Sequence, residues 1–138
     1  MNQEQEQFFD FLRDSGEFDN LQLSIISLGL KNGYSTDQVA LYADPKFDGY
    51  QMGQILRAFE DGLTEDQVAV FADPKFDYLQ MEQFRLGLVH GLTTDQVRTF
   101  ADPTIKYEDM RVIRHRLSQP ERTSVRVKPP VQRTGKNR

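Results

Sequence analysis

The sequence contains a 29-residue unit three times in succession, followed by a fourth, partial copy. The segments 18–44, 47–73 and 76–102 align without a gap, and the string ADPKFD begins at Ala43 and again at Ala72. Tandem repeats of this length are typical of small helical units that stack, because a single unit cannot bury its own apolar face. The repeat therefore predicts an architecture, but it does not by itself indicate an activity.

Each copy is expected to form a long helix followed by a short one. In the third copy Asp77 can cap the long helix, and Gln80, three residues later, has the spacing of a capping box. Gly91 can end this helix in a left-handed conformation, and Thr93 can then cap the short helix. Equivalent residue types recur in the first and second copies. These capping and terminating residues predict a pair of helices in every complete copy.

The long helices carry apolar residues at i, i+3 and i+7, which is one stripe of a helix. A small residue stands within this stripe at Gly29, Ala58 and Gly87. We expect the small residues to let neighbouring helices approach closely, which offsets the helix cost of glycine, about 1 kcal/mol. The predicted core positions are Leu23, Ile26, Leu30, Met52, Ile55, Phe59, Met81, Phe84, Leu88, Met110, Ile113 and Leu117.

The two ends of the chain depart from the repeat. Residues 3–13 predict a leading helix that covers the first unit. In the fourth copy Lys106 replaces the capping Asp and Arg116 replaces the small residue, so the array is expected to end there. The expected fold is all-α, with helical-hairpin repeats stacked as a small solenoid or a compact bundle. The expected segments are a capping helix at 1–17, a repeat domain at 18–119 divided into 18–46, 47–75, 76–104 and 105–119, and a basic tail at 120–138.

The net charge of −4 combines two parts of opposite sign. Residues 1–110 contain 20 Asp/Glu and 8 Lys/Arg, a net of −12, whereas residues 111–138 contain one Glu and 9 Lys/Arg, a net of +8. After Pro120 the chain is polar and basic without apolar periodicity, so the tail is expected to be disordered. Such a charge distribution bears on binding partners rather than on the fold.

Catalysis has little support in the sequence. Cysteine is absent, His90 is expected at a helix C-terminus, where the dipole favours it, and His115 is expected on an exposed helix face. The Gly-Leu-Thr segments lack a phosphate-loop pattern. Carboxylates such as Asp61 and Glu65 could act as acid/base groups or metal ligands, but their recurrence at helix starts favours a structural role. We expect no enzymatic activity, no cofactor and no metal.

Two sets of charged residues are candidate binding sites. A basic set could contact nucleic-acid phosphate with salt-sensitive affinity, or it could be a solvated tail that rests on the acidic body. An acidic set could dock on a positively charged protein surface. The acidic residues are Asp48, Asp61, Glu65, Asp66, Asp77, Glu82 and Asp95. The basic residues are Arg111, Arg114, Arg116, Arg122, Arg126, Lys128, Arg133, Lys136 and Arg138.

Positions at which the copies differ are a third candidate, because stacking alone does not require differences between units. Such positions could contact a protein partner, or they could be ordinary variable surface. The Asp-Pro turns, in contrast, are nearly identical and are more simply explained as turns. The variable sets are Asn20/Gly49/Tyr78/Tyr107, Leu21/Tyr50/Leu79 and Leu28/Arg57/Leu86/His115.

The phrase GLTEDQVAVFADPKFDYLQMEQFRLGL at residues 62–88 resembles repeats of polypeptides from phages and conjugative elements of Firmicutes. Those repeats have a GLSxxQVxxYADPKFDxxQMxxIRxGL pattern and often adjoin DNA-transfer or anti-defence modules. The likeness covers residues 18–117, whereas Gly49, Gly53, the arginine-rich fourth copy and the tail depart from it. It implies a scaffold without catalytic residues, and small proteins of such elements include anti-CRISPR inhibitors.

The leading hypothesis is therefore a non-enzymatic binding protein of a phage or mobile element that occludes a CRISPR-type nuclease through its acidic surface. The alternative is a nucleic-acid-associated adaptor whose tail contacts phosphate while the repeats hold a protein. A self-assembling structural module is a third possibility. No apolar run approaches the roughly 20 residues of a membrane span, and the acidic start MNQEQEQ is unlike a signal peptide, so the bacterial cytoplasm is the expected location.

Overall fold

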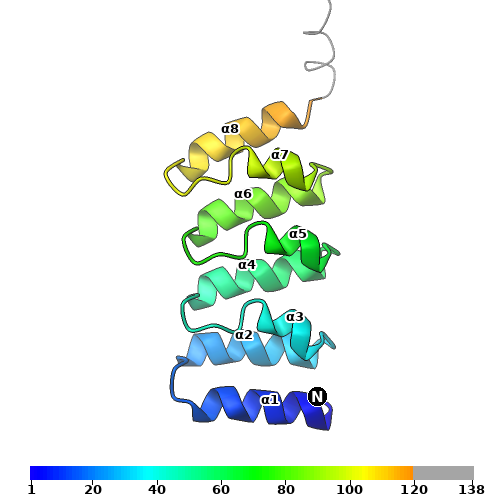
Figure 1. Cartoon of the computed structure of the whole chain (residues 1–138), viewed down its shortest axis with the longest axis vertical. Coiled ribbons are helices and arrows are strands. Elements are labelled where there is room, and N and C mark those ends of the chain that lie inside the picture. Colours follow the sequence, from blue (N-terminus) through cyan, green and yellow to red (C-terminus); the bar gives the residue numbers. More distant parts are fainter. Residues whose placement is uncertain (120–138) are drawn as a thin grey trace, which may run out of the picture.

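A computed structural model describes residues 1–119, and all regular secondary structure in this range is helical. The all-α class is confirmed for these residues, with one leading helix, three pairs of a long and a short helix, and a terminal helix (Figure 1). None of these helices is long and apolar enough to span a membrane. The predicted tail at 120–138, including its disorder, lies outside the described residues. The helices are α1 (Gln3–Asp14), α2 (Asn20–Lys31), α3 (Thr36–Ala40), α4 (Gly49–Glu60), α5 (Glu65–Ala69), α6 (Tyr78–Val89), α7 (Thr94–Arg98) and α8 (Tyr107–Leu117).

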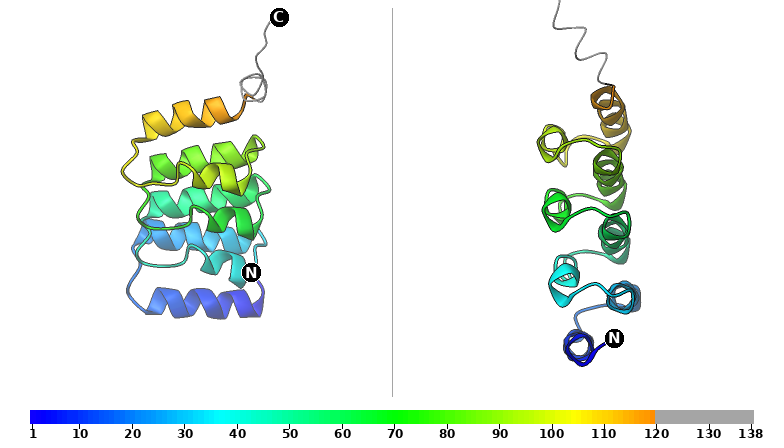
Figure 2. Two further views of the ribbon diagram at one scale, coloured as in Figure 1. Left: turned by 45° about the horizontal axis from the view of Figure 1, so that its top comes forward. Right: turned by 90° about the vertical axis from the view of Figure 1, so that its right-hand side faces the viewer.

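The long helices α2, α4, α6 and α8 lie side by side in chain order, each packed against the next. The short helices α3, α5 and α7 form a second row on one side of them, as the edge-on view of Figure 2 shows. Helix α1 packs against α2 and α3 and lies in the row of the short helices. The four long helices run in the same direction, so the array has an N-terminal edge and a C-terminal edge, named for the helix ends that meet there.

The predicted capping boxes begin the helices. The Asp48 carboxylate accepts the amide of Gln51 at 2.8 Å, and Gln51 Oε1 accepts the amide of Asp48 at 2.7 Å. The other long and short helices of the three complete units begin with the same reciprocal pair. Lys106 occupies the N-cap position before α8 and makes no side-chain cap, as expected. Helix α1 has a further capping box, between Asn2 and Gln5, which the repeat pattern does not predict.

The predicted stripe forms most of the core. Six of its members have no exposed surface, whereas Leu23, Ile113 and Leu117, near the two ends of the array, are only half-buried. Each short helix adds a buried valine, and a buried aromatic residue follows each short helix. The left-handed glycines end the long helices as predicted: φ is 94° at Gly33, 92° at Gly62 and 101° at Gly91. The six fully buried stripe residues are Ile26, Met52, Ile55, Met81, Phe84 and Met110.

The small residue within the stripe of the first unit makes room for the short helix of that unit and for Tyr42. A Cβ atom on Gly29 would overlap the hydroxyl oxygen of Tyr42, which belongs to the same unit. The Tyr42 hydroxyl donates to the Ile25 carbonyl at 3.2 Å. Val39 Cγ2 of the neighbouring helix α3 would lie 3.4 Å from the same Cβ, so Gly29 lets α3 and Tyr42, which follows it, approach α2 closely, as expected. In the third unit a Cβ on Gly87 would lie 2.9 Å from Leu92 Cδ1.

The capping glutamines also join successive units, a role that the capping box does not predict. Gln51 Nε2 donates to the carbonyl of Phe76, the first residue of the next unit, at 2.6 Å, and to that of Pro74, in the turn that closes its own unit, at 3.1 Å. Gln22 and Gln80 make the equivalent bonds to the units that follow them, and α1 is joined to the first unit in the same way. All three glutamines are buried. Because buried carbonyls need donors, each glutamine stabilises both its own helix and the contact with the next unit.

Candidate functional site

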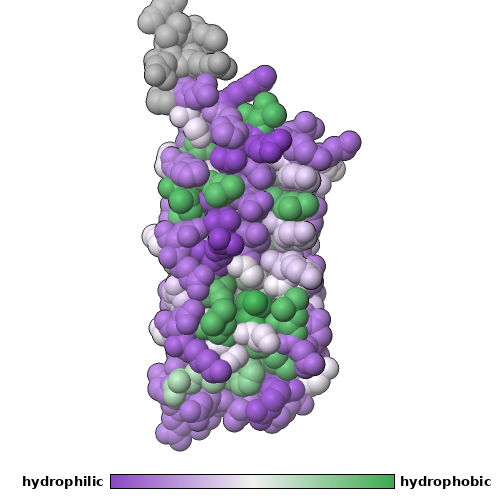
Figure 3. All heavy atoms as spheres, turned by 180° about the vertical axis from the view of Figure 1, so that it is seen from behind, coloured by the Kyte–Doolittle hydropathy of each residue, from purple (hydrophilic) through white to green (hydrophobic). Residues whose placement is uncertain are grey.

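The long helices leave one face uncovered by the short helices, and we call it the outward face. Figure 3 views the molecule from this side and shows an apolar area over α2 and α4, with mostly polar surface around it. Leu21 and Leu28 of α2 contribute to it with 43% and 45% of their surface exposed. Exposed large apolar side chains that lie together are typical of a binding surface.

A strip of exposed large side chains runs along the N-terminal edge of this face. Tyr50 of α4 is 63% exposed and Tyr78 of α6 is 40% exposed, and their ring centroids are 5.4 Å apart with an interplanar angle of 34°. Leu21 lies over Gly49, where a Cβ atom would overlap its side chain. We call Leu21, Tyr50 and Tyr78 the aromatic strip. Glycine at the first position of α4 therefore makes room for a strip residue.

The structure brings the variable positions of the repeat together at the surface. Two of the variable sets supply the aromatic strip. The third set follows the outward face along the array, with Leu28, Arg57 and His115 exposed and Leu86 half-buried. The sequence indicated this surface, because the copies of the repeat differ in residue type at these positions.

The predicted acidic set does not form a single surface. Asp48 and Asp77 cap α4 and α6 at the N-terminal edge, next to the aromatic strip. The members at the C-terminal edge are separated from them by a 12-residue helix, which is about 18 Å long. Glu82 lies on α6 between the two groups. The members at the C-terminal edge are Asp61, Glu65, Asp66 and Asp95.

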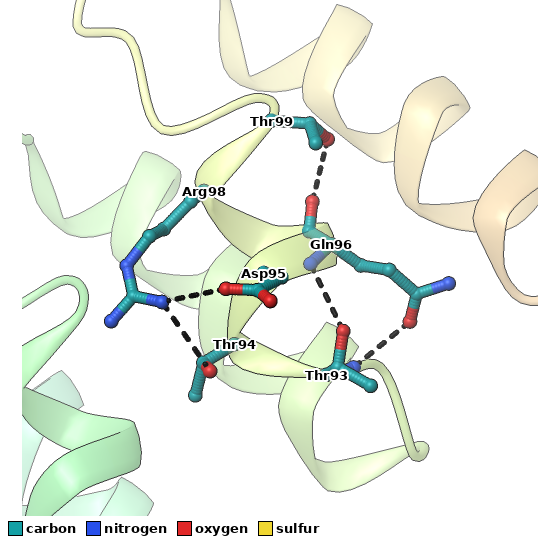
Figure 4. Close-up of polar contacts among 6 residues, drawn as sticks. All are labelled: Thr93, Thr94, Asp95, Gln96, Arg98 and Thr99. Atoms are coloured by element: carbon teal, nitrogen blue, oxygen red, sulfur yellow. Dashed lines mark hydrogen bonds and ion pairs between the residues drawn. The ribbon is translucent and has the colours of Figure 1, made fainter.

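One of these carboxylates has a neighbouring cation in the same helix. Figure 4 shows α7, where Arg98 Nη1 donates to Asp95 Oδ1 at 3.0 Å. The Asp95 side chain is 93% exposed, so this pair is weak and Asp95 stays open to a partner. The same view shows Thr93 and Gln96 in the reciprocal bonds that begin the helix.

Asp61, in contrast, forms an ion pair with a buried arginine of the next unit. Arg85 Nη1 lies 2.7 Å from Asp61 Oδ2, and Arg85 Nε donates to Gln54 Oε1 at 3.0 Å. The Arg85 side chain is 7% exposed and that of Asp61 is 32% exposed. Arg85 therefore ties α6 to α4, and Asp61 supplies the countercharge of a buried guanidinium. The sequence does not reveal this pair, because the equivalent position in α4 is Leu56.

Replacing Asp61 with alanine is expected to lower the free energy of unfolding by about 1.5 kcal/mol, because it leaves the buried Arg85 guanidinium with only its longer contact to the Glu82 carboxylate, at 3.9 Å. The figure is below that for a fully buried pair because Asp61 is partly exposed. Asp66→Ala, at an exposed position in the first turn of α5, is the matched control and is expected to cost under about 0.5 kcal/mol. Urea denaturation measures both values. Equal losses would show that the Arg85 pair contributes nothing specific.

The basic set is also divided by the structure. Arg111 and Arg116 are exposed on α8, but Arg114 is only 8% exposed and its Nε donates to Gln83 Oε1 at 3.0 Å. Burial lowers the pKa of Arg114, and the neighbouring Arg111 lowers it further. The assignment of Arg114 to a phosphate-contact set is therefore wrong, since its side chain packs between α6 and α8. The remaining members lie outside the described residues: Arg122, Arg126, Lys128, Arg133, Lys136 and Arg138.

Other chemistry is sparse among residues 1–119. His90 follows the last turn of α6 and His115 is exposed, as predicted. No three His, Cys, Asp or Glu side chains within this range are grouped so that they could hold a metal ion.

No protein-family model, no curated protein and no solved structure matches this chain.

Proposed function

We propose that the chain is a non-enzymatic helical-repeat protein, in which 29-residue units stack as a short solenoid and the outward face binds another protein. The aromatic strip is the observation that carries this proposal. Stacking does not require Tyr50 or Tyr78 to be aromatic, since α2 has Asn20 where α6 has Tyr78, and α8 has Glu108 where α4 has Tyr50. Exposed tyrosines that serve no packing need are enriched in protein interfaces.

A protein partner fits this surface better than a small molecule. Ligand sites are concave and enclose most of the ligand, whereas Tyr50 of the strip is 63% exposed. Tyrosine provides a large contact area with few rotatable bonds, so it loses little entropy when it is fixed in an interface. Asp48 and Asp77 lie beside the strip and add negative charge to its border.

For the identity of the partner, we propose a basic protein that handles nucleic acid, with a CRISPR-type nuclease as the leading case. Residues 1–119 contain 20 Asp/Glu and 11 Lys/Arg, a net of −9. This charge favours a positively charged channel by steering and complementarity, while the strip supplies the central contacts. The resemblance of the repeats to those of phage and mobile-element proteins supports the same choice. Binding in such a channel would inhibit the nuclease by occlusion.

Photo-cross-linking against a panel of purified CRISPR-type nucleases tests this proposal. A benzoylphenylalanine at position 50 is expected to form an adduct with the nuclease that the chain inhibits. The matched control carries the same probe at position 69, an exposed alanine of α5 in the row of short helices. Adducts from both positions would refute the outward face as the binding surface. Inhibition without a position-50 adduct would also refute the face, and absence of binding across the panel would refute the nuclease as partner.

The alternative adaptor function depends on the tail, in which residues 120–138 contain six Lys/Arg and one Glu. If the tail contacts phosphate, the full-length chain is expected to shift DNA or RNA at low salt, and a chain ending at Gln119 is expected to lose this binding. The slope of affinity against salt should flatten on truncation, because fewer counterions are released. A gel-shift titration at several salt concentrations measures both effects. Absence of binding by the full-length chain at low salt would contradict the adaptor function.

A further inference from the structure

A groove with a volume of about 450 Å³ lies at the first end of the array, between α1 and α2. Because α1 occupies the row of the short helices, the row of the long helices begins with α2 (Figure 2). Phe9 of α1 lines one side of the groove. One face of α2 lines the rest, through Asn20, Leu23, Ser24, Ser27, Leu28 and Lys31.

This is the face with which each later long helix packs on the long helix before it. At the position of Ser27, α6 and α8 have arginines that are buried and bonded to Gln54 and Gln83 of the preceding helix. At the position of Leu23, the later helices have methionines with no exposed surface, whereas Leu23 is half-buried. Leu28, on the same face, is 45% exposed. Helix α2 thus presents a helix-packing face that carries no long helix among residues 1–119.

This face of α2 is complementary to a second copy of itself that runs in the opposite direction. When two copies of α2 pack antiparallel, one register places Leu23 opposite Leu28 and the two serines opposite each other, Ser24 facing Ser27. The same register places Asn20 opposite Lys31, where the Asn20 carbonyl can accept a hydrogen bond from the ammonium group and the Asp19 carboxylate lies next along the chain. Small residues at the centre allow the helices to approach closely. A two-fold axis makes every one of these contacts twice.

The opposite end of the array is not a suitable partner for this groove. The free side of α8 has Asp109 where the other long helices have the glutamine that donates to the next unit. A carboxylate has no proton to donate there. Arg116 also stands where the other long helices have Gly29, Ala58 or Gly87. Head-to-tail stacking would therefore lose the bond that joins successive units, whereas the antiparallel pair requires no group from α8.

We propose that this groove is a dimer interface, in which a second copy of the chain packs its α2 antiparallel against α2. The pair covers the exposed part of Leu28 and places one α1 on each side of the paired helices. This inference does not depend on the partner of the aromatic strip, because the groove shares Leu28 with the outward face but is lined by none of the three strip residues. It leaves Tyr50 and Tyr78 of both copies free to bind.

Analytical ultracentrifugation of the full-length protein tests the dimer. We expect the mass to reach twice the chain mass and no more, and Ser27→Arg to weaken association at least tenfold, because each arginine projects into the groove. Ala69→Arg, which adds the same charge on α5, is the control and should dimerise as the wild type does. Both arginines already occur at equivalent positions, as Arg85 and Arg98, so both variants are expected to fold. Circular dichroism checks this for each variant.

A monomeric wild type at all concentrations would overturn the proposal, as would a dimer unaffected by Ser27→Arg. Growth of the mass beyond two copies would indicate head-to-tail assembly instead and would overturn it equally.

The register has a separate test, because the chain contains no cysteine and introduced cysteines are unique. A mixture of Ser24→Cys and Ser27→Cys proteins is expected to form the mixed disulfide faster than either protein forms its own. Mass spectrometry of the oxidised mixture distinguishes the three products. Preference for the two homodimeric disulfides would contradict the antiparallel register.

Discussion

Replacing Gln51 with glutamate is expected to lower the free energy of unfolding by about 3 kcal/mol, which is the largest effect among the substitutions considered. The change replaces the Nε2 donor with an oxygen, so the buried Phe76 carbonyl and the Pro74 carbonyl lose their donor and face a carboxylate. The cap itself is retained, because the amide of Asp48 still finds an acceptor.

Gln67→Glu is the matched control for this prediction. Gln67 accepts the amide of Thr64 in the capping box of α5 and makes no bond to another unit within residues 1–119. Its replacement is expected to cost under about 1 kcal/mol. Urea denaturation of both variants measures the difference, and similar losses would mean that the bond between units adds nothing to the cap.

Gly29→Ala is expected to lower the free energy of unfolding by about 2 kcal/mol, because the added methyl group overlaps the Tyr42 hydroxyl in a packed core. In a Tyr42→Phe background the same substitution is expected to be neutral or to stabilise by up to about 1 kcal/mol, the helix advantage of alanine over glycine. The second unit already has this combination, with Ala58 and Phe71 at the equivalent positions.

A double-mutant cycle on these two sites, measured by urea denaturation, isolates the steric term. A cost of Gly29→Ala that is the same in both backgrounds would show that the Tyr42 hydroxyl is not the obstacle.

The helices and most of the core could be predicted from the sequence because their signals are local. A cap such as Asp77 and its partner Gln80 are three residues apart, and the left-handed glycines mark the helix ends wherever they occur. The stripe positions are buried between the short helix of their own unit and the neighbouring long helices. Only the stripe residues near the ends of the array, such as Leu23 and Leu117, are less buried than the pattern predicts, since one neighbouring helix is missing there.

The features that could not be predicted all depend on contacts between units. The side-chain Nε2 of Gln80 donates to the carbonyl of Ile105, 25 residues later, and Arg85 pairs with Asp61, 24 residues earlier. An arginine such as Arg114 is usually exposed, but here the packing of α8 against α6 buries it. The acidic set was grouped by charge alone, and the direction of the helices divides it between two edges. The positions of the aromatic strip could be predicted, because the copies differ there. The contact of Tyr50 with Tyr78 could not be predicted.

The central claim, that the outward face binds a protein through the aromatic strip, is tested most directly by calorimetric titration of the nuclease found by cross-linking. The Tyr50→Ser/Tyr78→Ser variant is expected to bind at least about 30-fold more weakly than the wild type, because exposed tyrosines in an interface carry much of the binding energy. Its melting temperature should change little, since neither side chain belongs to the buried core. Asp66→Asn, at the opposite edge, should bind as the wild type does. Equal affinity of the strip variant and the wild type would contradict the claim.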